Sequence, residues 1–180
     1  FDAIANSRVL DITYSRFNGA RPYYWKIHPY FLKQYNNRWF LLGLNDYSKK
    51  ISILALDRID DLKEIRMDFI PNTTINFEEY FKDIIGTTKE NAPIENVRMQ
   101  FSKNRFPYVE TKPIHGSQKI IDHGNRIIEI KVIPNKELIS HILTYGNDVE
   151  VLSPQFIRDE IRAILEDALH AIIGARSQDL

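Results

Sequence analysis

The chain has 180 residues, no cysteine, and 24 basic against 24 acidic residues, so its formal net charge is zero. The absence of cysteine excludes a disulfide scaffold and thiol-based zinc or redox sites, and it fits a reducing compartment. No apolar run approaches the ~20 residues that span a bilayer, and no signal peptide is recognisable. The sequence therefore predicts a cytoplasmic protein with no membrane partner.

The charge is unevenly distributed along the chain. Residues 1–66 contain 11 Lys and Arg against 7 Asp and Glu, whereas residues 67–180 contain 13 against 17. This asymmetry predicts two modules, with any contact to a polyanion on the first. A chance imbalance in a short domain explains the counts equally well.

Residues 7–66 have the pattern of a five-stranded meander. Strand-forming residues fill 9–14, 24–35, 38–44 and 51–56 and recur near Leu62 and Ile65, with turn signals at Asn18-Gly19 and Asn36-Asn37. Pro29 cannot donate a ladder hydrogen bond, so its strand is expected to lie at an edge or to bulge there. Five short strands in about 60 residues suit a small barrel.

The next segment, residues 67–94, is predicted to be a connector. Phe77, Tyr80, Phe81, Ile84 and Ile85 have helical spacing, and Gly86 would end that helix.

Residues 95–180 predict an α+β module. A strand around Val97 precedes a hairpin formed by Ile120-Ile121 and residues 127–133, and Asn135 is a good N-cap for the helix that follows. After a strand over 149–152, Ser153-Pro154 begins a final helix. Its apolar stripe consists of Ile157, Ile161, Ile164, Leu165, Ala168 and Ile172. This order of elements resembles a ferredoxin-like α+β domain.

Several short segments together resemble one family. They are Val9–Tyr14, His28-Pro29, Arg38-Trp39-Phe40-Leu41, Leu56-Asp57-Arg58-Ile59 and, near the end, Tyr145–Pro154. Their order and spacing resemble a WYL-domain transcriptional regulator with its C-terminal WCX extension. In this sequence Trp39-Phe40-Leu41 stands where the family has Trp-Tyr-Leu.

The resemblance implies a fold and a role. It implies an SH3- or Sm-like WYL barrel in residues 1–66, a helical connector in 67–94 and a WCX domain in 95–180. Such bacterial regulators bind DNA through a winged helix-turn-helix that usually precedes the WYL domain. That domain is missing here, and the start at Phe1 rather than Met suggests that a preceding part existed. Many members are homodimers, and the WYL domain is thought to sense a nucleotide or single-stranded nucleic acid.

Two positions depart from the family pattern. Phe40 replaces the tyrosine and so lacks a phenolic hydrogen bond. Ser52 stands where the fourth strand often carries an arginine, which removes one cation from any phosphate site. The alternative is a protein–protein interaction and dimerisation module that senses no ligand.

Cations and aromatic rings of the first module are the candidate ligand contacts. Arginine matches phosphate with a planar fork, and rings offer stacking surfaces for bases. The predicted contacts are Tyr14, Arg16, Lys26, His28, Tyr30, Arg38, Phe40 and Arg58.

Structural roles compete with this interpretation at several positions. Core packing is favoured for Trp39 and Leu41. A salt bridge from Arg58 to Asp57 or Asp61 competes with ligand contact, and a plain surface position competes at His28.

No enzyme or metal site is predicted. The five histidines show no metal-ligand spacing, and no glycine-rich phosphate loop is present. His115 lies two residues from Ser117, but no nucleophile elbow surrounds them. No cofactor is expected. The polar loop Pro113–Gln118 is a second contact surface, a dimer element or, as favoured, a loop that leads into a strand.

Overall fold

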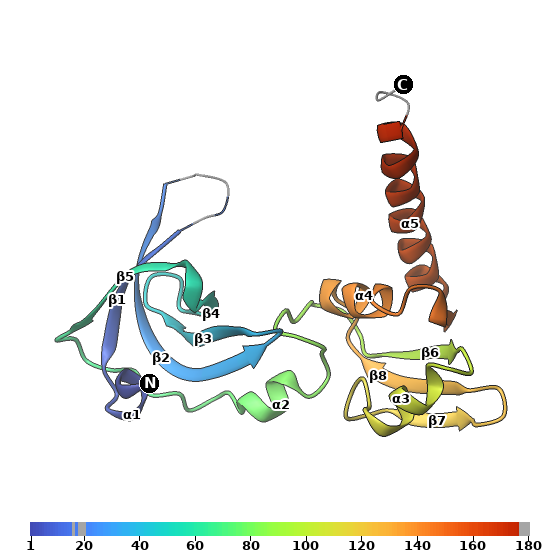
Figure 1. The fold of residues 1–180 in the computed structure, drawn as a ribbon. Coiled ribbons are helices and arrows are strands. Elements are labelled where there is room, and N and C mark those ends of the chain that lie inside the picture. The colour runs from blue at the N-terminus through green and yellow to red at the C-terminus, as the bar shows by residue number, and fades with distance from the viewer. Residues whose placement is uncertain (16, 18–20, 177–180) are drawn as a thin grey trace. The chain divides into compact units, whose positions relative to one another are not determined.

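The computed structural model describes residues 1–15, 17 and 21–176, with side chains to residue 174 (Figure 1). Two predictions lie outside these residues: the ligand contact at Arg16 and the turn at Asn18-Gly19. The chain forms two compact units, Phe1–Tyr80 and Phe81–Leu180.

The first unit is a five-stranded antiparallel sheet with short helices around it. In the sheet the strands lie in the order β4-β3-β2-β1-β5. Its elements are α1 (Asp2–Ala5), β1 (Val9–Tyr14), β2 (Tyr23–Tyr35), β3 (Arg38–Asn45), β4 (Lys50–Ala55), the 3₁₀ helix η1 (Leu56–Arg58), β5 (Ile59–Ile65) and α2 (Phe77–Phe81).

The predicted strands are present, but the predicted closed barrel is not. Among the described residues no pairing joins the outer strands β4 and β5. The sheet curls because the long strand β2 bends, as Figure 1 shows. Its register with β3 shifts between Pro29 and Phe31, which confirms the predicted bulge.

Alternation along the strands forms the core of this unit. Leu41 is buried, as predicted, together with residues from the facing positions of the other strands: Leu10, Ile12, Tyr14, Ile27 and Leu54. Trp39 shares the face of Leu41, yet it is 47% exposed. It lies one residue from the start of β3, beside the turn at Asn36-Asn37, at the end of the strand rather than in its buried middle. The prediction of core packing was therefore wrong for Trp39.

The connector helix is shorter than predicted, since α2 ends at Phe81. The backbone N–H of Ile133 donates to the carbonyl of Asp83 (2.7 Å), and the Asn135 side chain donates to that of Ile85 (2.8 Å). These carbonyls bond to residues about 50 positions away, so the chain leaves the helix before Gly86.

The second unit is a four-stranded antiparallel sheet in the order β7-β8-β6-β9, with helices between its strands. The succession β-α-β-β-α-β followed by a long helix is the predicted one. The elements are β6 (Glu95–Phe101), α3 (Phe106–Thr111), β7 (Lys119–Asp122), β8 (Ile127–Val132), α4 (Lys136–Leu143), η2 (Gly146–Asp148), β9 (Val149–Ser153) and α5 (Gln155–Arg176).

Local signals set the helix boundaries of this unit. The side chain of Asn135 accepts a hydrogen bond from the N–H of Leu138 (2.8 Å), which confirms it as the N-cap of α4. Within the described residues, no helix is long and apolar enough to cross a membrane.

Two half-buried histidines are expected to lower the free energy of unfolding of this unit at mildly acidic pH. Burial lowers the pKa of both His115 and His141 below the ordinary 6.5, and the Lys112 charge lowers the pKa of His141 further. The unfolded state therefore binds more protons as the pH falls through 6.5, so stability decreases. We expect the free energy of unfolding to drop between about pH 7.5 and 5.5, before most carboxylates titrate.

Urea unfolding at several pH values measures this dependence. The double variant His115→Gln, His141→Gln should flatten the profile, whereas His170→Gln at an exposed position of α5 should leave it unchanged. An equally steep profile in the double variant would assign the effect to other groups.

Candidate ligand-binding surface

Arg58 is fixed between two aromatic rings at the end of η1. Its guanidinium carbon lies 4.7 Å from the centroid of the Tyr14 ring and 4.4 Å from that of Phe17. Its Nε and Nη2 atoms donate to the carbonyl of Ser15 at 3.1 and 2.8 Å. The partner of Arg58 is therefore a main-chain oxygen rather than the carboxylate of Asp57 or Asp61.

Tyr14 joins this arrangement to the sheet. Its hydroxyl accepts a hydrogen bond from the N–H of Ala55 (3.2 Å), which links the end of β4 to β1. The ring is buried, so Tyr14 positions the Arg58 guanidinium by cation–π contact.

Two further rings extend the stack along the β1–β2 pair. The Trp25 ring lies 5.7 Å from the Tyr14 ring at an interplanar angle of 24°, and 4.4 Å from the Tyr23 ring at 15°. Cross-strand register explains why the three rings are neighbours. Tyr14 pairs directly with Tyr23, and Trp25, two residues further along β2, is its diagonal neighbour on the same face. We call the resulting set the stacked row, and its members are Tyr23, Trp25, Tyr14, Arg58 and Phe17.

Sequence reasoning identified only Tyr14 and Arg58 of the stacked row. Phe17 is 77% exposed, and the Tyr23 and Trp25 rings are half-buried. The two-residue spacing of Tyr23 and Trp25 opposite Tyr14 was the signal that could have found them. Exposed faces of flat rings beside a guanidinium can stack with other flat, electron-rich groups.

Arg38 lies in a separate hollow of the same unit. Its Nε atom is 3.3 Å from the carboxylate of Asp57, and both side chains are about half-exposed, at 48% and 49%. An ion pair so exposed to water is weak and can exchange for another anion. The hollow has a volume of about 460 Å³ and is lined by Asn36, Asn37, Arg38, Trp39, Leu56 and Asp57. Arg58 is not among these residues, so the two arginines occupy different places.

His28 and Tyr30 both contact the chain that follows β5. His28 is fully buried, and its Nδ1 accepts a hydrogen bond from the N–H of Ile70 (3.0 Å) while Nε2 lies 3.5 Å from Asp46. The Tyr30 hydroxyl donates to the carbonyl of Ile70 (2.8 Å). The alternative of a surface histidine was therefore wrong, and both side chains already have partners within the unit.

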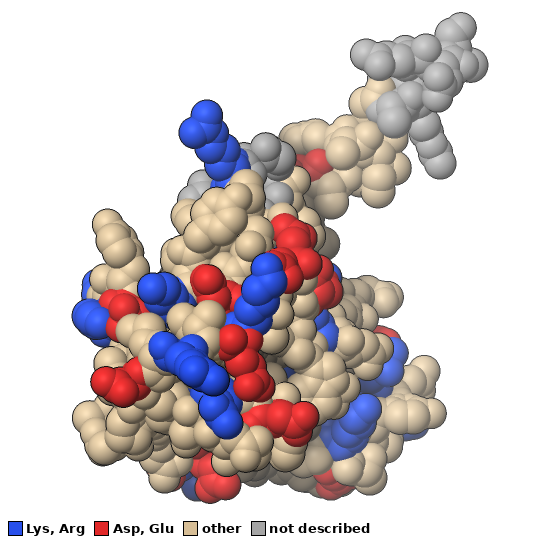
Figure 2. All heavy atoms as spheres, turned by 90° about the vertical axis from the view of Figure 1, so that its left-hand side faces the viewer, with Lys and Arg blue, Asp and Glu red and all other residues tan. Residues whose placement is uncertain are grey.

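Lys26 and Phe40 are not members of the stacked row. Lys26 is exposed and pairs in register with Asp11, which also pairs with Lys63. Phe40 is half-buried on the face of β3 opposite Leu41. In Figure 2 the Lys and Arg side chains of the visible face are interspersed with Asp and Glu.

The loop Pro113–Gln118 is held by its own hydrogen bonds. The hydroxyl of Ser117 donates to the carbonyl of Lys131 (3.1 Å) and accepts from its N–H (2.8 Å). The side chain of Gln118 accepts from Ile114 and donates to Val109, at 2.9 Å each. These contacts support the favoured interpretation, a loop that leads into β7.

Two family profiles match the chain. The WYL domain matches residues 1–64, and the WCX domain matches residues 93–169. A search of curated proteins finds no match.

Two solved structures are similar to the chain at low sequence identity. A CRISPR Cas-related protein is 14% identical, with 97% of this chain and 50% of that chain covered and a TM-score of 0.50. Proteasome accessory factor B/C (PafBC) of Arthrobacter aurescens is 16% identical, with 89% of this chain and 24% of that chain covered and a TM-score of 0.42. The chain thus spans half or less of the length of these proteins. From the two profile matches, the chain belongs to the WYL-domain family, with its WYL domain followed by a C-terminal WCX domain.

Proposed function

We propose that this chain is the ligand-sensing and dimerisation part of a bacterial transcriptional regulator that acts in the cytoplasm. Its WYL domain binds a nucleotide or a single-stranded nucleic acid, and a winged helix-turn-helix elsewhere in the longer protein binds DNA. In this proposal residues 1–66 are an SH3- or Sm-like unit, 67–94 a connector and 95–180 a ferredoxin-like WCX domain. The chain has no enzymatic activity of its own.

The stacked row is the observation that supports ligand sensing. It combines a guanidinium with the exposed ring of Phe17 and the half-buried rings of Tyr23 and Trp25. Single-strand binders use this combination, in which bases stack on rings and cations contact the phosphates. Arg38 offers a second cation, through an exposed ion pair that a phosphate can replace.

Binding of short labelled oligonucleotides and of mononucleotides at two salt concentrations tests the proposal. We expect measurable affinity for single-stranded DNA or RNA, falling as salt increases because counterions are released from the phosphates. No binding to any of these probes, or an affinity indifferent to salt, would refute it.

Phe17→Ala is the most informative single variant. The ring is 77% exposed, so its removal should leave stability nearly unchanged. Loss of one stacking surface should weaken binding about tenfold, or about 1.4 kcal/mol. Tyr47→Ala removes another ring of the same unit, 91% exposed and outside the stacked row, and should bind as the wild type does. Equal affinity of all three proteins would exclude Phe17 from the site.

A dimerisation module that senses no ligand is the second candidate. It is favoured by the partners that Arg58 and Arg38 already have within the chain, and by the interspersed charges in Figure 2. A dimer that binds none of the nucleic-acid probes would support it.

A further inference from the structure

The final helix α5 is anchored at its beginning and exposed beyond. Ile157 is fully buried and Ile161 half-buried, but later members of the predicted apolar stripe are exposed, and so is Leu169, which the prediction did not include. Their exposed fractions are 38% for Ile164, 54% for Leu165, 55% for Leu169 and 61% for Ile172. Large aliphatic side chains on consecutive turns of one helix are seldom left in water.

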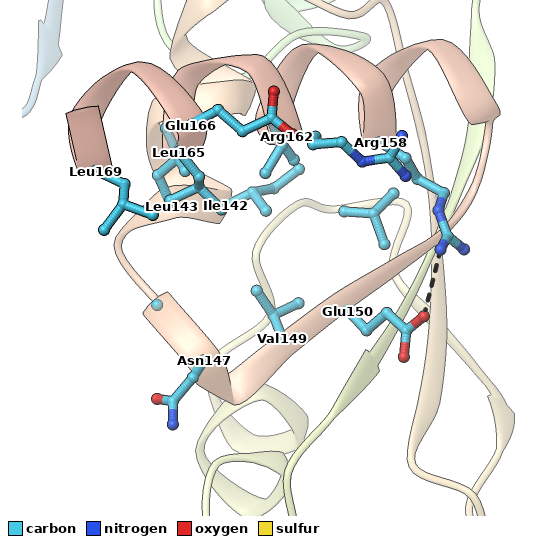
Figure 3. Close-up of a pocket in the computed structure, with 13 residues that line it drawn as sticks. Ile142, Leu143, Asn147, Val149, Glu150, Arg158, Arg162, Leu165, Glu166 and Leu169 are labelled. Carbon is cyan, nitrogen blue, oxygen red and sulfur yellow. Dashed lines mark ion pairs between the residues drawn. The ribbon is translucent and has the colours of Figure 1, made fainter.

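An apolar groove runs beside the same helix. Its volume is about 610 Å³, and its walls are α5 on one side and α4, η2 and β9 on the other. Figure 3 shows Leu165 and Leu169 of α5 facing Ile142, Leu143 and Val149 across it. Arg158, at the rim of the groove, is paired with Glu150 (3.5 Å). One helix therefore supplies both a wall of the groove and an exposed apolar ridge.

We propose that α5 pairs antiparallel with α5 of a second copy, so that the exposed half of each helix fills the groove of the other. The inference rests on the dimerisation role in the proposed function and gives it a place in the WCX domain. A two-fold dimer needs one surface that is complementary to itself, and a ridge and a groove on the same helix meet this condition. A 22-residue helix is about 33 Å long, which gives each copy several turns of contact.

The sequence of α5 specifies a register for the pair. If the two-fold axis passes near Leu165, the Leu165 side chains of the two copies meet at the axis. Ile161 of each copy then lies opposite Leu169 of the other, so apolar residues also meet on either side of the axis. The same register brings Arg162 of each copy near Glu166 of the other, since these residues are one turn apart on the side that lines the groove. Within one copy Arg162 lies 3.5 Å from Asp159, and both side chains are more than half-exposed, so this ion pair is weak.

The charges around the groove favour a second copy over a membrane surface. Helices that lie on membranes carry Lys and Arg along the polar face. The edge of this groove carries both signs, with Arg158 and Arg162 near Glu150 and Glu166. Such a mixed edge is complementary to its own two-fold image.

Light scattering and sedimentation equilibrium at tens of micromolar test the proposal. The wild type should have twice the chain mass of 21.2 kDa. The double variant Leu165→Glu, Leu169→Glu should have the mass of one copy, with the same helical circular dichroism because both positions are already half-exposed. Ala163→Glu also introduces a glutamate into α5, but on its exposed opposite side, and should remain dimeric.

A charge exchange tests the register at exposed positions that are not needed for folding. Arg162→Glu should raise the dimer dissociation constant about tenfold, and adding Glu166→Arg should restore it. A monomeric wild type, a double-Glu variant that stays dimeric, or an exchange that restores nothing would overturn the proposal. Oligonucleotide binding by the monomeric variant reports on sensing separately, so failure of one idea is distinguishable from failure of the other.

Discussion

Replacing Asn135 with alanine is expected to lower the free energy of unfolding of the WCX domain by about 3 kcal/mol. The side chain caps α4 through the N–H of Leu138, a contact worth about 1 kcal/mol. Its Nδ2 atom also donates to the carbonyls of Ile85 and Thr88, at 2.8 Å each. Ile85 is buried, so its carbonyl would lose its donor away from water, which costs about 2 kcal/mol. Thr88 is exposed, and water can replace the donor that its carbonyl loses.

Asn135→Asp separates the two contributions. Aspartate is as good an N-cap as asparagine, so the bond from Leu138 survives. It has no donor, however, and it places a carboxylate against the carbonyls of Ile85 and Thr88. We expect it to be at least as destabilising as Asn135→Ala in urea unfolding. A near-neutral Asn135→Asp would show that the cap alone matters.

Gly43→Ala is expected to destabilise the WYL domain by about 2–3 kcal/mol. A Cβ atom at Gly43 would lie 2.5 Å from the carbonyl oxygen of His28 and 2.6 Å from the Ile27 side chain. Both belong to β2 just before the bulge, and β2 cannot retreat there without disturbing the pairing of Ile27 with Leu10 of β1. Forcing a methyl group into a packed site costs energy of this order.

Gly116→Ala is the matched control for this substitution. Nothing lies within 4 Å of a Cβ atom at Gly116, so the same added methyl group should change thermal stability little. If Gly43→Ala melted with the wild type, the close approach of β2 to Gly43 would be contradicted.

Local patterns in the sequence were sufficient to predict the strands and the N-cap of α4. The turn at Asn36-Asn37 has both residues at positive φ, 48° and 60°, which asparagine tolerates and a two-residue hairpin requires. Period two along β3 placed Leu41 in the core, and Asn135 identified the start of α4 because capping depends on neighbouring residues only.

Features that depend on distant residues could not be predicted. The end of α2 is set by hydrogen bonds from Ile133 and Asn135, about 50 positions away, which leave no local signal. The partner of Arg58 is a main-chain carbonyl, and every residue has one, so the sequence suggested carboxylates instead. Closure of a sheet depends on the curvature of all its strands, which five separate patterns do not reveal.

The strand β5, at one edge of the WYL-domain sheet, affects how the chain behaves at high concentration. An edge strand presents unpaired N–H and C=O groups that can recruit a strand from another molecule and begin a fibre. Between Ile59 and Ile65, β5 carries Asp60, Asp61, Lys63 and Glu64, all exposed. Stacking identical copies along this edge would bring like charges together and strip water from them. The charged side chains of β5 therefore disfavour fibre formation along this edge of the sheet, and they lie far along the sequence from the exposed apolar residues of α5.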